Sequence, residues 1–192
     1  VNALGQLNEN VYDAQGNLTQ IKDVLGRVAM GLGYDGAGNL TQLTDQAGQI
    51  RNFTYDERGN QTSTSYDWSN PSDPSDTRLV TTRTFYDASG QVTNTVDPEG
   101  NRATTFYNAI GKPERTVDKL GNATLYLYDA RGNGIETRYP DGTVASTVYD
   151  ADARAVVTAD RHVIGDPANG TRTILDAAGR VVRAERLSGV VV

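Results

Sequence analysis

A short motif recurs along the chain and constrains the fold more than any other feature of the sequence. It is a Tyr-Asp pair, then two variable residues, then Gly, usually with Asn after it, as in residues 12–17. Successive motif tyrosines are 22, 21, 31, 21, 21 and 21 residues apart, and seven of the ten tyrosines occupy this position. A fixed period indicates an architecture built from one repeated unit. The recurring positions are Tyr12, Asp13, Gly16, Tyr34, Asp35, Gly38, Tyr55, Asp56, Gly59, Tyr86, Asp87, Gly90, Tyr107, Gly111, Tyr128, Asp129, Gly132, Tyr149 and Asp150.

The motif has the chemistry of a tight hairpin turn. An Asp at the first turn position bonds backbone two residues on, and a Gly at the fourth accepts positive φ, which closes a type I turn with a G1 bulge. A second turn follows ten residues after the first Asp, as in Asp23–Gly26 and Asp45–Gly48, and residues 140–142 are a shifted version. Each repeat is therefore expected to contain two turns.

The segments between the turns have strand composition. Residues 17–22, 91–96 and 124–128 are rich in Thr, Val, Ile and Tyr and alternate partly with period two. No apolar pattern of helical period persists. The sequence predicts an all-β chain of consecutive antiparallel β-hairpins, with repeats of about 21 residues and roughly 16 half-repeats, in a curved or spiralling sheet. We expect Leu18, Leu40 and Val92 on its apolar face, and Thr19, Thr41, Thr62 and Thr93 on the other.

Two insertions interrupt an otherwise single repeat array over residues 1–192. The first, near 66–77, is rich in Pro, Ser and Asp and holds the only Trp, Trp68, beside Tyr66. An exposed excursion is expected there, with Tyr66 and Trp68 as candidate binding residues. The alternative, which we favour, is that Trp68 folds back to pin the loop. The second insertion, near 161–170, holds the only histidine, His162, which we interpret as a surface side chain.

Composition excludes several classes of protein. The chain has no Cys, so thiol catalysis, disulfides and Cys-ligated zinc are excluded. A net charge of -6 argues against nucleic-acid binding, and no apolar run is long enough to span a bilayer. The hydrophobic share of 37% suits a thin sheet rather than a deep core. Because the chain opens on Val1, we expect a mature product or an excised fragment.

The sequence predicts no enzyme. With a single histidine, the chain could form at most one Ser/His/Asp catalytic set. The sequence has neither a G-x-S-x-G motif nor a phosphate loop. The repeated Asp residues are explained more simply by turn bonding than by catalysis. The calcium-binding nonapeptide of RTX proteins is missing, and weak Ca²⁺ binding by the polar turns is a minor alternative. No catalytic, cofactor-binding or metal residue and no cofactor is therefore predicted.

The motif resembles the RHS/YD-repeat family. The consensus Y-D-x-x-G-N-x-T is matched fully by residues 12–19, 34–41 and 55–62. The resemblance implies that the hairpins form a hollow β-shell. Such shells are found in bacterial polymorphic and insecticidal toxins and in animal teneurins, and the bacterial shells enclose a C-terminal toxin. The plug motif of such shells, Y-D-P-x-x-G-R-x-x-x-x-D-P, is absent from this sequence. Some family members cut themselves at the end of the repeat region, and the resemblance assigns this activity to no residue here. The segment is expected to be a fragment of a larger shell.

These features favour a non-enzymatic wall segment of an exported bacterial shell, either extracellular or at the cell surface. Its expected partners are further repeats of the same parent chain or identical chains through open β-edges, an enclosed toxin domain, and surface glycans. Two alternatives stay open. One is a carbohydrate-binding, receptor-binding or adhesion module that uses the tyrosine columns and the Trp68 segment. The other is a self-assembling extracellular fibre built through the strand edges.

Overall fold

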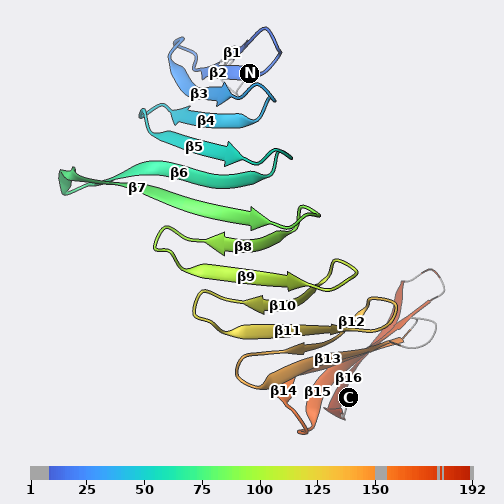
Figure 1. Cartoon of the computed structure of the whole chain (residues 1–192). Helices are drawn as coiled ribbons and strands as arrows, with labels where there is room; N and C mark the ends of the chain where they lie inside the picture. The colour runs from blue at the N-terminus through green and yellow to red at the C-terminus, as the bar shows by residue number, and fades with distance from the viewer. Residues whose placement is uncertain (1–8, 150–154, 177, 179, 191–192) are drawn as a thin grey trace. The chain divides into compact units, whose positions relative to one another are not determined.

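The chain is all-β, as the repeat predicts. The computed structural model describes residues 9–149, 155–176, 178 and 180–190. These residues form sixteen antiparallel strands, and the strand order in the sheet is the order in the chain (Figure 1). None of the described residues lies in a helix. The predicted succession of antiparallel hairpins is therefore confirmed.

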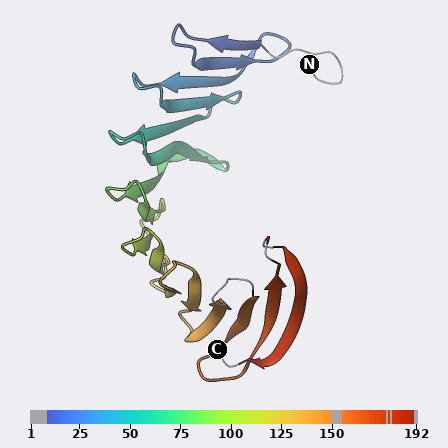
Figure 2. The same cartoon turned by 90° about the vertical axis from the view of Figure 1, so that its right-hand side faces the viewer.

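The chain divides into two compact units, residues 1–102 and 103–192. Seen from the side, the strands of the first unit lie in one layer (Figure 2). Its strands are β1 (Glu9–Tyr12), β2 (Leu18–Lys22), β3 (Val28–Tyr34), β4 (Leu40–Asp45), β5 (Ile50–Tyr55), β6 (Gln61–Asn70), β7 (Asp73–Tyr86) and β8 (Val92–Val96).

The second unit continues the pattern and then lengthens its strands. The strands are β9, which begins at the boundary (Arg102–Tyr107), β10 (Pro113–Val117), β11 (Ala123–Tyr128), β12 (Gly134–Arg138), β13 (Thr143–Tyr149), β14 (Ala155–Val163), β15 (Ala168–Leu175) and β16 (Val181–Val190). The last three strands have 9, 8 and 10 residues, against 5 or 6 in β9–β12.

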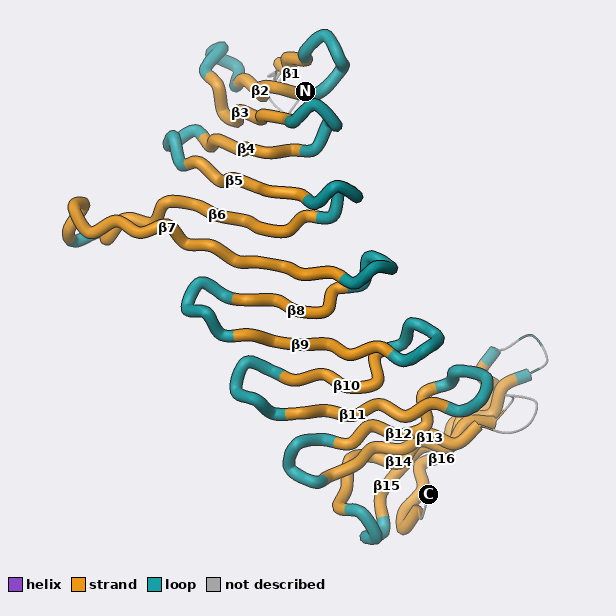
Figure 3. The backbone as a smooth tube through the Cα atoms, viewed as in Figure 1, coloured by secondary structure: helices purple, strands orange, loops and turns teal. Residues whose placement is uncertain are grey.

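The turns have the predicted geometry. In the turn at residues 56–60, Asp56 N–H donates to the carbonyl of Asn60 (2.9 Å), and Gly59 N–H donates to the carbonyl of Asp56 (3.0 Å). Gly59 has a φ of 82°, in the left-handed region that favours glycine. The register of the ladder then shifts between Thr54 and Tyr55, as expected of a bulge beside such a turn. The tube drawing shows turns alternating between the two edges of each unit (Figure 3).

The two faces of the first unit differ in polarity. Leu32 lies opposite Leu43 in the β3–β4 ladder, so these apolar side chains share a face. Gln42 points to the other face, where it lies opposite Asn52 and donates a side-chain hydrogen bond to it (3.2 Å). The expected separation of apolar and polar side chains is only partial, because Arg51 lies opposite Leu43 on the Leu32 face and Ile50 lies opposite Thr44 on the Gln42 face.

The core is thin. Among the described residues, the buried hydrophobic side chains are Val144, Ala159 and Ala168, and all three belong to the second unit. No large side chain in the described part of the chain is fully buried. Backbone ladders and short-range side-chain contacts therefore hold the sheet together more than a packed interior does.

Both interruptions of the repeat differ from the loops expected. Near 66–77, β6 and β7 lengthen to 10 and 14 residues and pair nearly to the tip, where Ser72 N–H donates to the Asn70 side chain (2.9 Å). Near 161–170, β14 runs to Val163 and β15 starts at Ala168. Residues such as Pro71 and Asp73 indicated an irregular loop, but in the first interruption irregularity is confined to the tip, where the register shifts between the Ser69–Thr77 and Asn70–Asp73 pairs.

Candidate functional site

The side chain of the motif Asp organises each turn. In the turn at residues 56–60, Asp56 Oδ1 accepts the backbone N–H groups of Arg58 and Asn60, both at 2.9 Å. Its Oδ2 accepts the side-chain amide of Asn60 at 2.9 Å. The Asn60 side chain, followed by its backbone amide, holds the pKa of the Asp56 carboxyl below its usual range. This hydrogen bonding explains why Asp and Asn recur with a fixed spacing.

The other turns repeat this arrangement with few changes. Asp13, Asp35, Asp118 and Asp129 each accept the same set of donors. Where Arg follows Gly, its guanidinium replaces the Asn amide, as in the pairs Asp23–Arg27 and Asp176–Arg180 (both 2.7 Å). Asn108 serves in place of Asp in the Tyr107 copy. Asp150 lies outside the described residues.

The motif tyrosines link each repeat to the one before it. In four repeats the Tyr hydroxyl donates to the backbone carbonyl of the residue six positions after the preceding motif Tyr. The bonds are Tyr34 to Leu18 (2.9 Å), Tyr55 to Leu40 (2.8 Å), Tyr86 to Gln61 (2.8 Å) and Tyr128 to Pro113 (2.7 Å). The tyrosine column is therefore a set of hydrogen bonds between repeats.

The Thr of the consensus forms a hydrogen bond between the two strands that flank the turn. Thr19, Thr41 and Thr93 donate to the carbonyl of the residue before the motif Tyr, each at 3.2 Å. In the third intact copy, Thr62 instead bonds the Thr54 hydroxyl (2.8 Å). Most letters of Y-D-x-x-G-N-x-T thus have a structural role that can be assigned in the sheet.

The carboxylates of these turns act as hydrogen-bond acceptors. Their pKa is lowered by amide and guanidinium donors, whereas a general acid or base near neutral pH needs a raised pKa. Among the described residues, no group of three or more His, Asp or Glu side chains is placed to hold a metal ion. No helix in the described part of the chain could cross a bilayer.

The two candidate binding residues come together on one face of the lengthened hairpin. Tyr66 lies opposite Val80, and Trp68 lies opposite Arg78, so all four side chains point to the same side. Tyr66 and Trp68 are half-buried. The Arg78 guanidinium lies over the indole ring, with its central carbon 4.6 Å from the ring centre. Trp68 thus stacks against Arg78 of its own hairpin and remains partly exposed.

A cleft in the first unit lies beside the turns that begin at Asp56 and Asp87. It has a volume of about 640 Å³ and is lined by hydroxyl and aromatic side chains that include Thr54, Ser63 and Phe85. Thr54 and Ser63 share a hydrogen bond (2.7 Å), and Arg58 bridges the rim to the carbonyl of Ala88.

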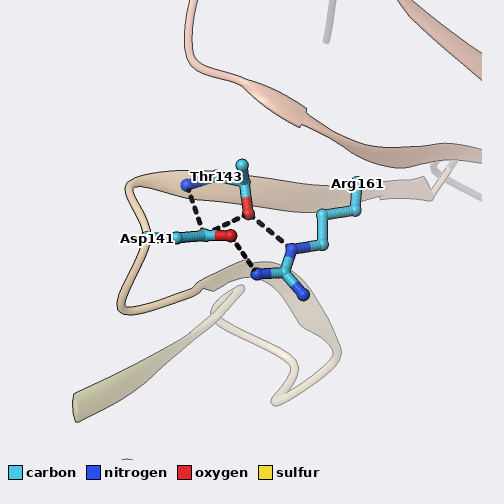
Figure 4. A network of polar contacts seen from close by, with 3 residues as sticks. All are labelled: Asp141, Thr143 and Arg161. Atoms are coloured by element: carbon cyan, nitrogen blue, oxygen red, sulfur yellow. Dashed lines mark hydrogen bonds and ion pairs between the residues drawn. The ribbon is translucent and has the colours of Figure 1, made fainter. Parts of the chain in front are cut away.

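A polar network fastens the shifted turn of the second unit (Figure 4). Tyr139 takes the first turn position, and Asp141 accepts the N–H (3.0 Å) and hydroxyl (2.6 Å) of Thr143. Arg161 of β14 pairs with Asp141, bonds Thr143, and lies over the Tyr139 ring at 4.0 Å. The Arg161 guanidinium is the main cause of the lowered pKa of Asp141. The network ties this turn to the neighbouring hairpin.

Sequence reasoning missed the partners of these residues. Arg78, Arg58 and Arg161 carry no motif signal, because their roles depend on strand register or on contacts between repeats. Counting outward from the Asn70–Asp73 turn does not find Arg78 either, because the register shifts between Ser69 and Asn70 and Trp68 therefore pairs with a residue farther along β7. His162 lies in β14 with its Nδ1 2.7 Å from the carbonyl of Asp160.

Hairpins of one repeated length, capped by Asp side chains and linked by Tyr hydroxyls, define a β-hairpin repeat protein of the YD type. Residues 34–67 match the family model described as RHS Repeat. This stretch contains two intact Tyr-Asp motifs and confirms the resemblance predicted from the sequence. Residues 34–67 are therefore an RHS repeat stretch, and the described hairpins outside it have turns of the same kind. None of the curated proteins matches it.

Solved structures of the same fold are far larger than this chain. The crystal structure of TcdB2-TccC3 superposes on 94% of the chain with a TM-score of 0.69 and 15% identity. TcdB2-TccC3-Cdc42 gives 0.68 over 94%, and TcdB2-TccC3 without its hypervariable C-terminal region gives 0.66 over 93%, both at 15% identity. The chain spans about a tenth of these proteins (10%, 11% and 10%). At this identity, the likeness shows the fold alone.

Proposed function

We propose that this chain is a non-enzymatic wall segment of a larger, exported bacterial RHS shell that encloses a toxin. The observation that carries the proposal is the strand order, in which every strand pairs with its neighbours in sequence. Within the described residues, β1 pairs with β2 alone and β16 with β15 alone, so both outermost strands offer unpaired backbone groups. Further hairpins of the same kind would satisfy them.

Tyr12 supports the same proposal. It is the first motif tyrosine, and 57% of its surface is exposed, whereas Tyr34 and Tyr55 are half-buried against the preceding repeat. A preceding repeat would supply the carbonyl and the packing surface that Tyr12 lacks among the described residues. The lowered pKa values of the turn carboxylates support a structural rather than catalytic use of the abundant Asp residues.

The test is a cryo-EM structure of the complete parent protein, secreted from its native host. We expect β1 and β16 to pair with flanking hairpins, and a second polypeptide segment to lie within the closed wall. Solvent-exposed β1 and β16 edges, or a closed wall without enclosed polypeptide, would contradict the proposal. Parent protein retained wholly in the cytoplasm would contradict the exported location.

The same two edges favour a second candidate, end-to-end association of the isolated chain. β16 offers ten residues, and Val181 and Val182 on it are 63% and 61% exposed. Sedimentation velocity over a range of concentrations tests this directly. We expect association that rises with concentration and is reduced by Val182→Lys, because edge charges oppose strand pairing. A monomer at every concentration would refute this candidate.

A further inference from the structure

The lengthened hairpin carries a surface that the repeat architecture does not require. β6 and β7 project beyond the neighbouring turns at that edge (Figure 1). One side of this projection presents Tyr66, Trp68, Arg78 and Val80, which we call the Trp68 face. Arg51 of β5 lies opposite Tyr66 and adds a second cation to this face. Neither the Tyr hydroxyl bonds nor the Asp turns involve any of these side chains.

Arg78 is arranged to receive an anion. Its guanidinium stacks on the Trp68 ring at 4.6 Å, which uses the flat side of the group and leaves its in-plane N–H donors available. In the part of the chain that the structure describes, no hydrogen bond or ion pair joins the guanidinium of Arg78 or of Arg51 to another residue. Because stacking already orders the side chain, less conformational entropy is lost when a carboxylate binds. Two such guanidiniums stand out on a chain whose net charge is -6.

A cleft with both apolar and charged walls adjoins the guanidinium. It has a volume of about 350 Å³ and lies between the hairpin and the turn that begins at Asp97. Tyr66, Trp68, Val80 and Pro98 give it apolar walls, and Glu99 lines it as well. A ligand carboxylate is attracted by Arg78 and repelled by Glu99. The carboxylate of a bound ligand should therefore lie at the Arg78 end of the cleft, away from Glu99.

We propose that the Trp68 face binds an acidic segment of another protein. A carboxylate of that segment pairs with the in-plane donors of Arg78, and a neighbouring apolar side chain enters the cleft beside Tyr66. Trp, Tyr and Arg are the residue types most enriched among binding hot spots. The Arg78 guanidinium covers one face of the Trp68 indole. A sugar would need a bare ring on which to stack, whereas this face of the ring offers the N–H donors of Arg78. These observations favour a carboxylate-bearing peptide over a glycan.

The test uses the full chain and an array of synthetic peptides of about 12 residues, in which Asp or Glu flanks a central Leu or Phe. A matched set carries Asn and Gln instead. We expect acidic peptides to bind. Their amide counterparts should bind with an affinity lower by a factor of about ten or more. Arg78→Gln and Trp68→Ala should each weaken the best peptide by about tenfold or more, because an Arg–carboxylate pair and an aromatic anchor are lost.

Arg115→Gln is the matched control, because its guanidinium lies over Phe106 at 5.3 Å on a different strand pair. It should bind the peptide as the wild type does. If Trp68→Ala lowers the melting temperature, the double variant Arg51→Gln with Arg78→Gln decides instead, since it leaves the indole in place. Thermal melts followed by circular dichroism verify folding.

Three results would overturn the proposal. The first is the absence of a preference for acidic over amide peptides, and the second is equal binding by wild type and Arg78→Gln. The third is a different occupant, shown either by a glycan array whose signals vanish in Trp68→Ala or by self-association that Trp68→Ala abolishes. Glycan signals would assign the face to a sugar, and self-association would assign it to another copy of the chain.

Discussion

Tyr34 donates its hydroxyl hydrogen bond to the backbone carbonyl of Leu18, at 2.9 Å. The turn that joins β2 to β3 lies at the opposite edge, so Tyr34 and Leu18 meet at the open end of that hairpin. There, no loop holds the strands together. Tyr55, Tyr86 and Tyr128 make the same bond in later repeats. The motif Tyr therefore closes the end of each hairpin that its turn leaves open.

Removing the Tyr34 hydroxyl should destabilise the fold measurably. Tyr34→Phe keeps the ring but leaves the Leu18 carbonyl without its side-chain donor, and we expect a loss of about 1 kcal/mol in the free energy of unfolding. Urea denaturation followed by circular dichroism measures it. Tyr66→Phe is the control, because no described residue bonds the Tyr66 hydroxyl. Equal stability of the two variants would contradict this role of the motif Tyr.

Gly36 and Gly38 occupy the same turn and should respond oppositely to Ala. Gly38 has a φ of 84° with no atom near its would-be Cβ, so Gly38→Ala meets backbone strain alone. We expect a loss of about 1–2 kcal/mol. Gly36 lacks positive φ and also has open space, so Gly36→Ala should be neutral or stabilising by about 0.4–1 kcal/mol. Urea midpoints of both variants test this, and equal destabilisation would refute it.

The predictable part of this fold is local. A turn is encoded within about five residues, so the roles of Asp56 and Gly59 follow from the amino-acid sequence alone. The acceptor of Tyr34 does not, because Leu18 is 16 residues away and the contact depends on strand register. Trp68 and Arg78 illustrate the same limit. Their stacking depends on the register of the lengthened hairpin, which shifts between Ser69 and Asn70, and the Pro and Ser content of this segment did not indicate that shift.

Acid should destabilise the chain through its turn carboxylates. Folding lowers the pKa of Asp56, chiefly through the Asn60 side chain, and the same holds for Asp13, Asp35, Asp118 and Asp129. The unfolded chain, with an Asp pKa of about 3.9, therefore binds more protons than the folded chain near that pH. Stability from these groups is fully present above that pKa and is lost as the pH falls through the lower folded values.

Urea midpoints measured from about pH 7 down to about pH 2.5 test this dependence. We expect a plateau at the upper end and a decline that begins near pH 4. Asp56→Asn should show a shallower decline, since an amide oxygen still accepts turn hydrogen bonds but does not titrate in this range. Glu57→Gln, at the adjacent exposed position, is the control and should follow the wild type. A wild-type midpoint that stays constant down to pH 2.5 would contradict the assignment.

Gly170 should tolerate no larger residue, for a reason that differs from Gly38. It lies opposite Ala159 in the β14–β15 ladder and is buried. A Cβ built on it would lie 2.1 Å from the carbonyl oxygen of Thr158, a backbone atom that cannot swing aside. Gly170→Ala must therefore displace β14 or β15, and we expect a loss of about 1–3 kcal/mol, the usual range for overpacking. Gly31→Ala, whose Cβ would meet Thr44 Cβ at an ordinary 3.8 Å, is the matched strand control. If urea unfolding shows both variants equally stable, the close β14–β15 approach is wrong.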